Sequence, residues 1–458
     1  MKPATVPPGV GRGQRAFLVS RRHFLHAVAG CFLVRPAVVG RAAQSPPSGR
    51  LNLACVGVGG RGADNLASLR GQNIVALCDV DEARAAASVK AFPGARFFRD
   101  WRRLLDAVGN EIDAVVVSTP DHTHAVVASA AMDLGKHVYC EKPLAHSLHE
   151  VRYLTEKARR KNLATQLGNQ GHSSESIREF VEMIRSGAIG VVREVHAFVG
   201  NSYRPRNYTV RPAERPPVPP TLDWDLWLGP APERPYHPVY LPGKWRGWVD
   251  FGTGITGDWV CHVLDPIYWA LELDAPSAVR AEAVDYDDAG VRAETFPAGA
   301  KITFEFPARG NRAPLKIVWH EGSVAPPRPA ELEEKRQLPG IGAIIIGDQG
   351  KVLHGSHGAA GAQLLPRARW DAYQRPPKTL PRSKGHYEDW VAACQGGAPA
   401  TSNFNYGGPL TEVALLGVAA LRFNGERLEW DSAALRFKNH DAANALINPP
   451  CRGGWKLA

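Results

Sequence analysis

The sequence predicts an α/β Rossmann domain followed by an α+β domain with an open, largely antiparallel sheet. In the first part of the chain, short apolar runs alternate with amphipathic stretches, and a glycine-rich turn follows the first apolar run. Strand, helix and strand at this spacing indicate a parallel sheet with crossover helices on both faces. Farther along, KITFEF and LKIVW have the alternating pattern of antiparallel strands. We expect a leader at 1–50, the Rossmann domain at 51–170 and the second domain at 171–458.

The individual elements can be assigned in chain order. Strands of the first domain are expected at LNLACVGVG, NIVALCDV, DAVVVSTP and KHVYCEKP, with helices between them. For the second domain we expect helices at 174–186, 254–271, 385–395 and 409–422, a strand at 191–198, and a last strand at RLEW.

A Pro-rich stretch at 204–242 has no periodicity. Long stretches of this kind inside a domain are usually binding loops or subunit contacts. Trp224, Trp227, Tyr236 and Tyr240 give it anchors that flexible linkers lack, so we predict that it is ordered.

The excess of positive charge lies in the leader. The chain has 55 Lys and Arg against 45 Asp and Glu, and residues 1–50 hold eight of the basic residues and no acid. The remaining 47 basic residues nearly balance the 45 acids, so the folded part offers no electrostatic case for nucleic acid or an acidic membrane surface.

The leader has the features of a twin-arginine export signal. Arg21 and Arg22 precede a short apolar run, and small residues follow it. We therefore expect a periplasmic or otherwise exported protein, folded with its cofactor before export. A disordered basic arm is the alternative, and a lipid anchor at Cys31 is a less favoured variant of export. The apolar run is too short to span a bilayer, so we expect no transmembrane span.

The cysteines indicate neither a metal site nor a disulfide framework. Cys55, Cys78 and Cys140 lie in apolar strand-like runs, where a small buried side chain is the ordinary interpretation. No CxxC or Cys/His ligand spacing occurs in the sequence, so we predict no bound metal.

A dinucleotide-binding turn follows the first strand. Gly57, Gly59, Gly60, Arg61 and Gly62 form a GxGxxG pattern between a strand and a helix. The first glycine permits the tight turn, the second lets the backbone approach a pyrophosphate, and the last lets the helix pack on the strand. The helix N-terminus then presents free N–H groups to the phosphates.

An acid at the end of the second strand identifies the nucleotide. Asp79 lies 22 residues after Gly57, where a carboxylate binds the ribose hydroxyls. A carboxylate there repels a 2'-phosphate, and no Arg or Lys follows at once, so NAD is favoured over NADP.

Several motifs together resemble the Gfo/Idh/MocA oxidoreductases, the glucose-fructose oxidoreductase and inositol dehydrogenase family. The matching segments are the glycine turn, TPDHTH at 119–124, EKP at 141–143, and GTG at 252–254 with the D-x-x-x-H of Asp258 and His262. The resemblance implies a substrate pocket between the two domains, polyol or sugar substrates, and homo-oligomer contacts through the second sheet. It also places Thr119, Pro120, His122 and Glu141 at the cofactor.

Three residues are the candidates for the chemistry of alcohol oxidation, which needs a base beside the cofactor. Asp258 and His262 are four residues apart and so share a helix face. His262 is the first choice for base, because its ordinary pKa is nearest neutrality, and Asp258 would orient it or bind substrate. Lys142 follows a parallel strand, at the edge where such sheets bind ligands, and it could stabilise a developing alkoxide or act as base. The resemblance to the family favours Lys142 over His262 as a catalytic residue.

Two further groups are candidates for substrate binding. Asn169, Gln170 and His172 offer amide and imidazole groups to sugar hydroxyls, although a glycine turn explains them almost as well. Lys244, Trp245 and Arg246 combine donors with aromatic faces, although core or interface anchoring is as common. A metal held by Asp258, His262 and His172 stays open. The HGSHG segment at 354–358 is interpreted as a solvated loop.

The leading hypothesis is therefore NAD-dependent oxidation or reduction of a ring hydroxyl on a sugar, glycoside or cyclitol, with the hydride passing to tightly held NAD. The alternative is an NAD-dependent glycoside hydrolase or lyase, which works by transient oxidation, elimination, water addition and re-reduction. Export favours this redox-neutral chemistry, because an exported enzyme cannot exchange NADH with a cytoplasmic pool. A sugar-binding protein with a vestigial cofactor fold is disfavoured, since all three candidate catalytic residues are present.

Overall fold

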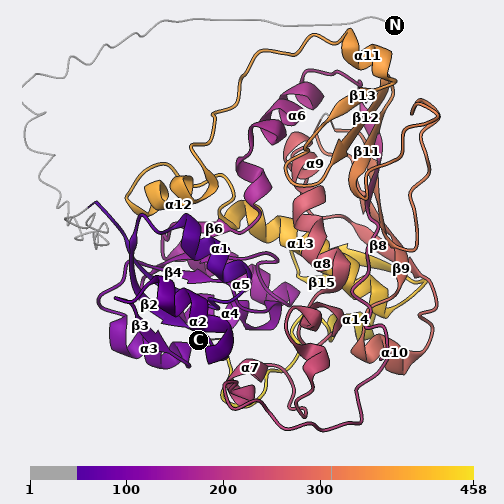
Figure 1. The fold of residues 1–458 in the computed structure, drawn as a ribbon. Helices are drawn as coiled ribbons and strands as arrows, with labels where there is room; N and C mark the ends of the chain where they lie inside the picture. Colours follow the sequence, from indigo (N-terminus) through magenta and orange to yellow (C-terminus); the bar gives the residue numbers. More distant parts are fainter. Residues whose placement is uncertain (1–48, 311, 458) are drawn as a thin grey trace, which may run out of the picture. The chain divides into compact units, whose positions relative to one another are not determined.

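The computed structural model describes residues 49–310 and 312–457 (Figure 1). The predicted export signal and Cys31 lie outside the described residues. Within the described part, no helix is long and apolar enough to cross a membrane. Cys55, Cys78 and Cys140 are buried, as predicted.

The first domain is built on a parallel sheet, as predicted. Within the described part, six strands lie in the order β3-β2-β1-β4-β5-β6. The apolar runs form these strands because both sheet faces are covered; all four residues of β4 are buried. The bounds are β1 Asn52–Val56, β2 Asn73–Cys78, β3 Arg96–Phe98, β4 Ala114–Val117, β5 His137–Cys140 and β6 Thr165–Leu167.

Three of the crossover helices, α2, α3 and α5, begin at side-chain caps. Asp81 accepts hydrogen bonds from the first amides of α2, and Asp100 does the same for α3. Ser147 and Glu150 form a capping box at the start of α5. The bounds are α1 Arg61–Ser68, α2 Glu82–Ala91, α3 Trp101–Val108, α4 Asp121–Asp133 and α5 Leu148–Arg160.

The second domain contains a mixed, largely antiparallel sheet. Within the described residues, nine strands lie in the order β13-β12-β11-β7-β10-β9-β8-β14-β15; β7 and β10 run parallel, and the other neighbours run antiparallel. The strand bounds are β7 Val192–Val199, β8 Ala278–Ala283, β9 Gly299–Phe306, β10 Leu315–Gly322, β11 Ile341–Gly347, β12 Gly350–Gly355, β13 Gln363–Leu365, β14 Arg427–Asp431 and β15 Arg436–Phe437.

Helices and short 3-10 turns complete the second domain. Their bounds are η1 Gln170–Ser173, α6 Glu175–Arg185, α7 Trp224–Leu228, η2 Pro238–Tyr240, η3 Lys244–Gly247, α8 Gly254–Val263, α9 Asp265–Ala270, α10 Ala289–Glu294, α11 Arg367–Asp371, α12 His386–Cys394, α13 Phe404–Arg422 and α14 Asp441–Asn444.

Three predicted elements differ in the structure. The helix expected at 254–271 is interrupted at Leu264, because Pro266 in the first turn of α9 has no N–H to continue the helix. Helix α13 begins at Phe404, five residues before the predicted start, because Asn403 caps it and Pro409 is tolerated inside. RLEW forms β14, but β15 and α14 follow it, so it is not the last strand.

The Pro-rich stretch is ordered, as predicted. Its four aromatic anchors pack into one apolar cluster together with Trp245, Trp248 and Phe251. The rings of Trp224 and Trp227 stack at 4.7 Å, and the indole N–H of Trp224 donates to the carbonyl of Arg234. This cluster fixes the chain just before α8.

Two C-terminal helices return to the first domain (Figure 1). Trp390 and Cys394 of α12 belong to the apolar cluster on one face of the first sheet, and Tyr387 stacks on Tyr139 of β5 at 5.4 Å. Helix α13 packs against both α5 and α8. The last part of the chain, with α12 and α13, therefore contacts the segments on both sides of the predicted boundary at residue 170.

Candidate active site

A cavity of about 600 Å³ extends along the carboxyl ends of the parallel strands. The glycine turn, Asp79, Thr119 and Pro120 line it from the first domain, together with Glu141 and Lys142 after β5. Parallel sheets bind ligands at this edge. The second domain contributes α8 and the turn η3, so the cavity combines the predicted cofactor site with candidate catalytic groups.

The glycine turn leaves no room for side chains. Gly57 has φ +80°, and a Cβ there would lie 2.7 Å from the carbonyl of Ser118. A Cβ on Gly62 would lie 1.7 Å from the carbonyl oxygen of Gly57, so this glycine serves helix packing. No side chain caps α1, so its N-terminus is available to a phosphate. These residues fit NAD, because the turn provides the close approach that a pyrophosphate needs.

Asp79 lies beside this turn. Its Oδ2 accepts hydrogen bonds from the N–H of Val58 at 2.9 Å and of Gly59 at 3.1 Å. Its Oδ1 accepts from the N–H of Asp81. The carboxylate thus lines the cavity at the end of β2, where the sequence predicts that it binds a ribose.

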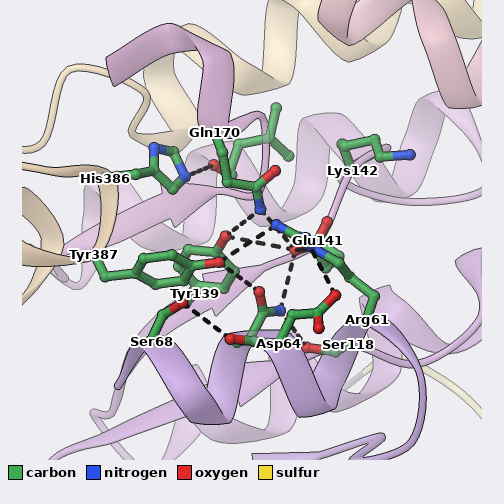
Figure 2. A network of polar contacts seen from close by, with 12 residues as sticks. Arg61, Asp64, Ser68, Ser118, Tyr139, Glu141, Lys142, Gln170, His386 and Tyr387 are labelled. Carbon is green, nitrogen blue, oxygen red and sulfur yellow. Dashed lines mark hydrogen bonds and ion pairs between the residues drawn. The ribbon is translucent and has the colours of Figure 1, made fainter. Parts of the chain in front are cut away.

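Glu141 is the centre of a polar network (Figure 2). Its Oε1 accepts from Gln170 Nε2 at 3.0 Å, from Asn65 Nδ2 at 3.1 Å and from Arg61 Nε at 3.4 Å. A Cβ on Gly168 would lie 2.6 Å from this carboxyl group, so the glycine makes room for it. The network joins α1 to β5 and brings Gln170 to the cavity wall.

Lys142 forms an ion pair with Asp258, and both side chains are largely buried, 12% and 6% exposed. The same carboxylate accepts from the hydroxyl of Tyr203 at 2.6 Å and lies 3.4 Å from Arg246 Nε. Burial opposes ionisation of Asp258, but Lys142 and Arg246 outweigh it and hold the pKa of this carboxyl far below its ordinary value. Asp258 therefore stays a carboxylate that positions the amine of Lys142.

His262 lies one helical turn after Asp258 and lines the cavity. Its Nδ1 is buried and has no hydrogen-bond partner among the described residues. Burial, together with the charge of Lys142, lowers its pKa well below the ordinary 6.5. The imidazole is thus neutral at the wall of the cavity.

The predicted solvated loop at HGSHG is confirmed for His357, which lies in an exposed turn, but the prediction was wrong for His354. His354 is buried in β12 against Phe180. His357 lines the cavity, and its ring lies 4.3 Å from that of His262. The main chain of 357–358 packs on Gly171, which carries the segment to the domain junction. The glycine-rich sequence predicts a loop here, but it does not show that the loop packs against the domain junction.

Asn169 and His172 do not line the cavity, contrary to the prediction. Asn169 Nδ2 lies 3.1 Å from Asp265 Oδ2, and His172 Nδ1 lies 2.8 Å from Oδ1 of the same residue. His172 also stacks on Trp269 at 4.6 Å. Their partners face them from α9, so only Gln170 of the three reaches the cavity.

Two further predicted residues lie elsewhere. His122 is enclosed between Trp227 and Phe251, its two ring nitrogens lie 3.0 and 3.2 Å from their carbonyl oxygens, and it does not line the cavity. Lys244 lines a neighbouring hollow, whereas Trp245 and Arg246 line the cavity as predicted. The turn η3 separates these side chains because successive residues of so tight a turn point in different directions.

Among residues 49–310 and 312–457, no three His, Cys, Asp or Glu side chains are placed to hold a metal ion. His172 is paired with Asp265, so it does not join Asp258 and His262.

Two family models match the chain. The first, described as the NAD-binding Rossmann fold of the Gfo/Idh/MocA oxidoreductase family, matches residues 51–169. The second, the C-terminal α/β domain of the same family, matches residues 174–306. Together they cover more than half of the chain.

Similar curated proteins match over about a third of the chain. Inositol 2-dehydrogenase 2 of Saccharopolyspora erythraea is 34% identical over 160 residues, which are 34% of this chain and 47% of that protein. Glycosyl hydrolase family 109 protein 2 of Akkermansia muciniphila is 33% identical over 163 residues, 32% of this chain and 33% of that protein. The chain therefore spans about half or less of the length of these relatives.

Solved structures match over both domains. The WlbA dehydrogenase of Bordetella pertussis, in complex with NADH and UDP-GlcNAcA, has a TM-score of 0.59 at 17% identity and covers 83% of this chain and 99% of its own. An inositol dehydrogenase homologue of Azotobacter vinelandii, complexed with NADH and myo-inositol, has a TM-score of 0.53 at 19% identity, with 85% and 98% covered. At this identity they establish the shared two-domain fold.

Proposed function

Because the chain belongs to the Gfo/Idh/MocA oxidoreductase family, we propose that it transfers hydride between NAD and a ring hydroxyl of a sugar, glycoside or cyclitol. The observation that carries the proposal is that Lys142 and His262 line the same cavity as the glycine turn. The inositol dehydrogenases among the similar proteins support a polyol or sugar as substrate.

The residues that would hold NAD are those at the strand ends. The turn from Gly57 to Gly60 and the N-terminus of α1 would bind the pyrophosphate, and Asp79 the adenosine ribose. Thr119 and Pro120, after β4, would lie along the nicotinamide. When bound, the nicotinamide supplies the hydride acceptor.

Lys142 and His262 would handle the substrate oxygen and its proton. The neutral imidazole of His262 accepts the hydroxyl proton, since its lowered pKa keeps it unprotonated near neutral pH. Lys142, fixed by Asp258, donates a hydrogen bond to the same oxygen and stabilises the developing alkoxide. Tyr203 donates to the other oxygen of Asp258, Oδ2, and Arg246 shares Oδ1 with Lys142.

The test begins with the purified protein. We expect denaturation to release NAD, and mixing the holoenzyme with sugars and cyclitols to produce NADH absorbance with at least one of them. A chain that binds no nicotinamide nucleotide, or that binds it but forms no NADH across the panel, contradicts the proposal.

The second candidate function is an NAD-dependent glycoside hydrolase or lyase that oxidises its substrate transiently. The similarity to a glycosyl hydrolase family 109 protein favours it. Aryl glycosides separate the two functions: aglycone release without net NADH supports the hydrolase, and stoichiometric NADH with no aglycone supports the dehydrogenase.

Export and self-association complete the proposal. The arginine pair and apolar run near the N-terminus support twin-arginine export to the periplasm, and fractionation of cells expressing the full chain tests it. The family resemblance supports contacts between copies through the second sheet, which sedimentation of the purified protein tests.

A further inference from the structure

A second hollow, of about 560 Å³, lies next to the active-site cavity. Pro242 and Gly243 line both, so only this short segment separates them. Tyr203 lines the second hollow, and its hydroxyl donates to Asp258 Oδ2 at 2.6 Å. The hollow therefore adjoins the residues that position Lys142.

Three cationic side chains, Arg204, Arg206 and Lys244, line this hollow. In the part of the chain that the structure describes, none of them makes a side-chain hydrogen bond or ion pair, and the lining contains no Asp or Glu. Three cations without a counter-charge around one concave surface create a local positive potential that attracts anions.

Other arginines of the same segment are neutralised. Arg211 Nη2 lies 2.8 Å from Glu294, and Arg234 pairs with both Asp250 and Glu294. Carboxylates are thus supplied close by for structural arginines, whereas Arg204 and Arg206 have none. What distinguishes Arg204 and Arg206 from Arg215, an exposed arginine of the same segment, is that they line one hollow together.

Much of the remaining wall consists of aromatic and proline rings. Tyr203 and Tyr208 line it together with Pro205 and Pro238, and the ring of Tyr208 meets that of His237 edge-on at 5.4 Å. Flat apolar faces beside cations suit a molecule that has both apolar ring faces and a negative charge.

We propose that this hollow is a subsite for an anionic substituent, a carboxylate or a sulfate ester, on a saccharide whose reacting ring occupies the active-site cavity. The proposal rests on the proposed function, because it extends the substrate of that cavity. Arginine forms paired hydrogen bonds with both planar and tetrahedral oxyanions, and two arginines with a lysine provide the donors. The substrate class is thereby narrowed to acidic glycosides or oligosaccharides.

Calorimetric binding to the NAD-loaded protein tests the subsite. Matched disaccharides are compared: neutral parents such as cellobiose, their uronate-terminated counterparts, and their sulfate esters. We expect a charged member to bind about tenfold more tightly than its parent at low salt, and the preference to shrink as salt is added. The uronate and sulfate arms show which oxyanion is preferred.

Two substitutions and a matched control locate the effect. In an Arg204→Gln, Arg206→Gln double variant, the preference should fall about tenfold, to near parity. Arg215 is an exposed arginine of the same segment that lines neither cavity, so Arg215→Gln should retain the preference. Thermal unfolding of each variant checks that the fold is intact.

The outcomes separate this proposal from the proposed function. If no charged member of any pair binds more tightly than its parent, or if the double variant retains the preference, the subsite is refuted. NADH formation from neutral and charged substrates alike would then leave the oxidoreductase intact. Selective binding of charged members without any NADH formation would instead refute the oxidoreductase and retain the subsite.

Discussion

Two clusters of similar composition are built around acids of successive helices, Asp258 of α8 and Asp265 of α9, but have different surroundings. The catalytic cluster, Lys142, Asp258 and His262, borders the active-site cavity, and His262 Nδ1 has no hydrogen-bond partner among the described residues. The buried cluster consists of Asn169, His172, Asp265 and Tyr406, and both oxygens of Asp265 accept hydrogen bonds within it. An acid beside a histidine therefore indicates a catalytic role only where the cluster borders a cavity and its polar atoms are not all paired with one another.

The largest expected effect is the loss of activity on removing the amine of the catalytic cluster. Lys142→Met should lower kcat by about 10³-fold, because the developing alkoxide loses its charged donor. Bound NAD, measured after denaturation, should be retained. Lys90→Met, at an exposed position of α2, is the control and should keep its rate. Equal rates in both variants would remove Lys142 from the mechanism.

Substitution within the buried cluster should instead lower the stability of the protein. Asp265→Ala leaves Asn169, His172 and Tyr406 without their acceptor, which should lower the free energy of unfolding by about 3 kcal/mol. Urea unfolding measures this loss. If stability were unchanged while kcat collapsed, the distinction between the two clusters would fail.

The next effect is the pH dependence of kcat/KM, which the catalytic cluster should determine. Because His262 has a pKa well below 6.5, it stays able to accept a proton as the pH falls past 6.5. We expect kcat/KM to decline only at lower pH, and His262→Gln to lower it about 100-fold and to remove this acid limb. The measurement is the pH profile of both proteins with one substrate. An acid limb centred at or above 6.5 would assign the proton to another group.

The last effect concerns histidines that are buried away from the cavity. Burial lowers the pKa of His122 and of His386 to about 3, from the ordinary 6.5. Between these values the unfolded chain binds more protons, so stability is present above pH 6.5 and is lost as the pH falls. Each such group contributes up to about 1.4 kcal/mol per pH unit in this window.

Urea unfolding as a function of pH checks this contribution. His386→Gln should make the decline of stability below pH 6.5 shallower than in the unmodified protein. Above that pH the two curves should run parallel, which serves as the internal control. A decline of unchanged steepness would show that His386 is not kept neutral by the fold.

Local sequence was sufficient wherever the function of a residue depends on its neighbours in the chain. The glycine turn, the acid after β2 and the four-residue spacing of Asp258 and His262 follow from backbone geometry within one strand, turn or helix. These predictions needed no knowledge of how the domains meet. Gly57, Asp79 and His262 line the cavity, and Asp258 pairs with Lys142, which lines it.

The partner of each polar side chain was decided by the tertiary structure. His172 and His357 are both histidines in glycine-rich turns, yet one faces Asp265 and the other faces His262. Such contacts join residues that are far apart in sequence, so no local pattern records them. The chain by itself determined the Rossmann fold and its nucleotide turn, because these depend on short-range backbone sterics. Only the folded chain decided which buried groups are satisfied and which remain open to substrate, because that depends on long-range packing.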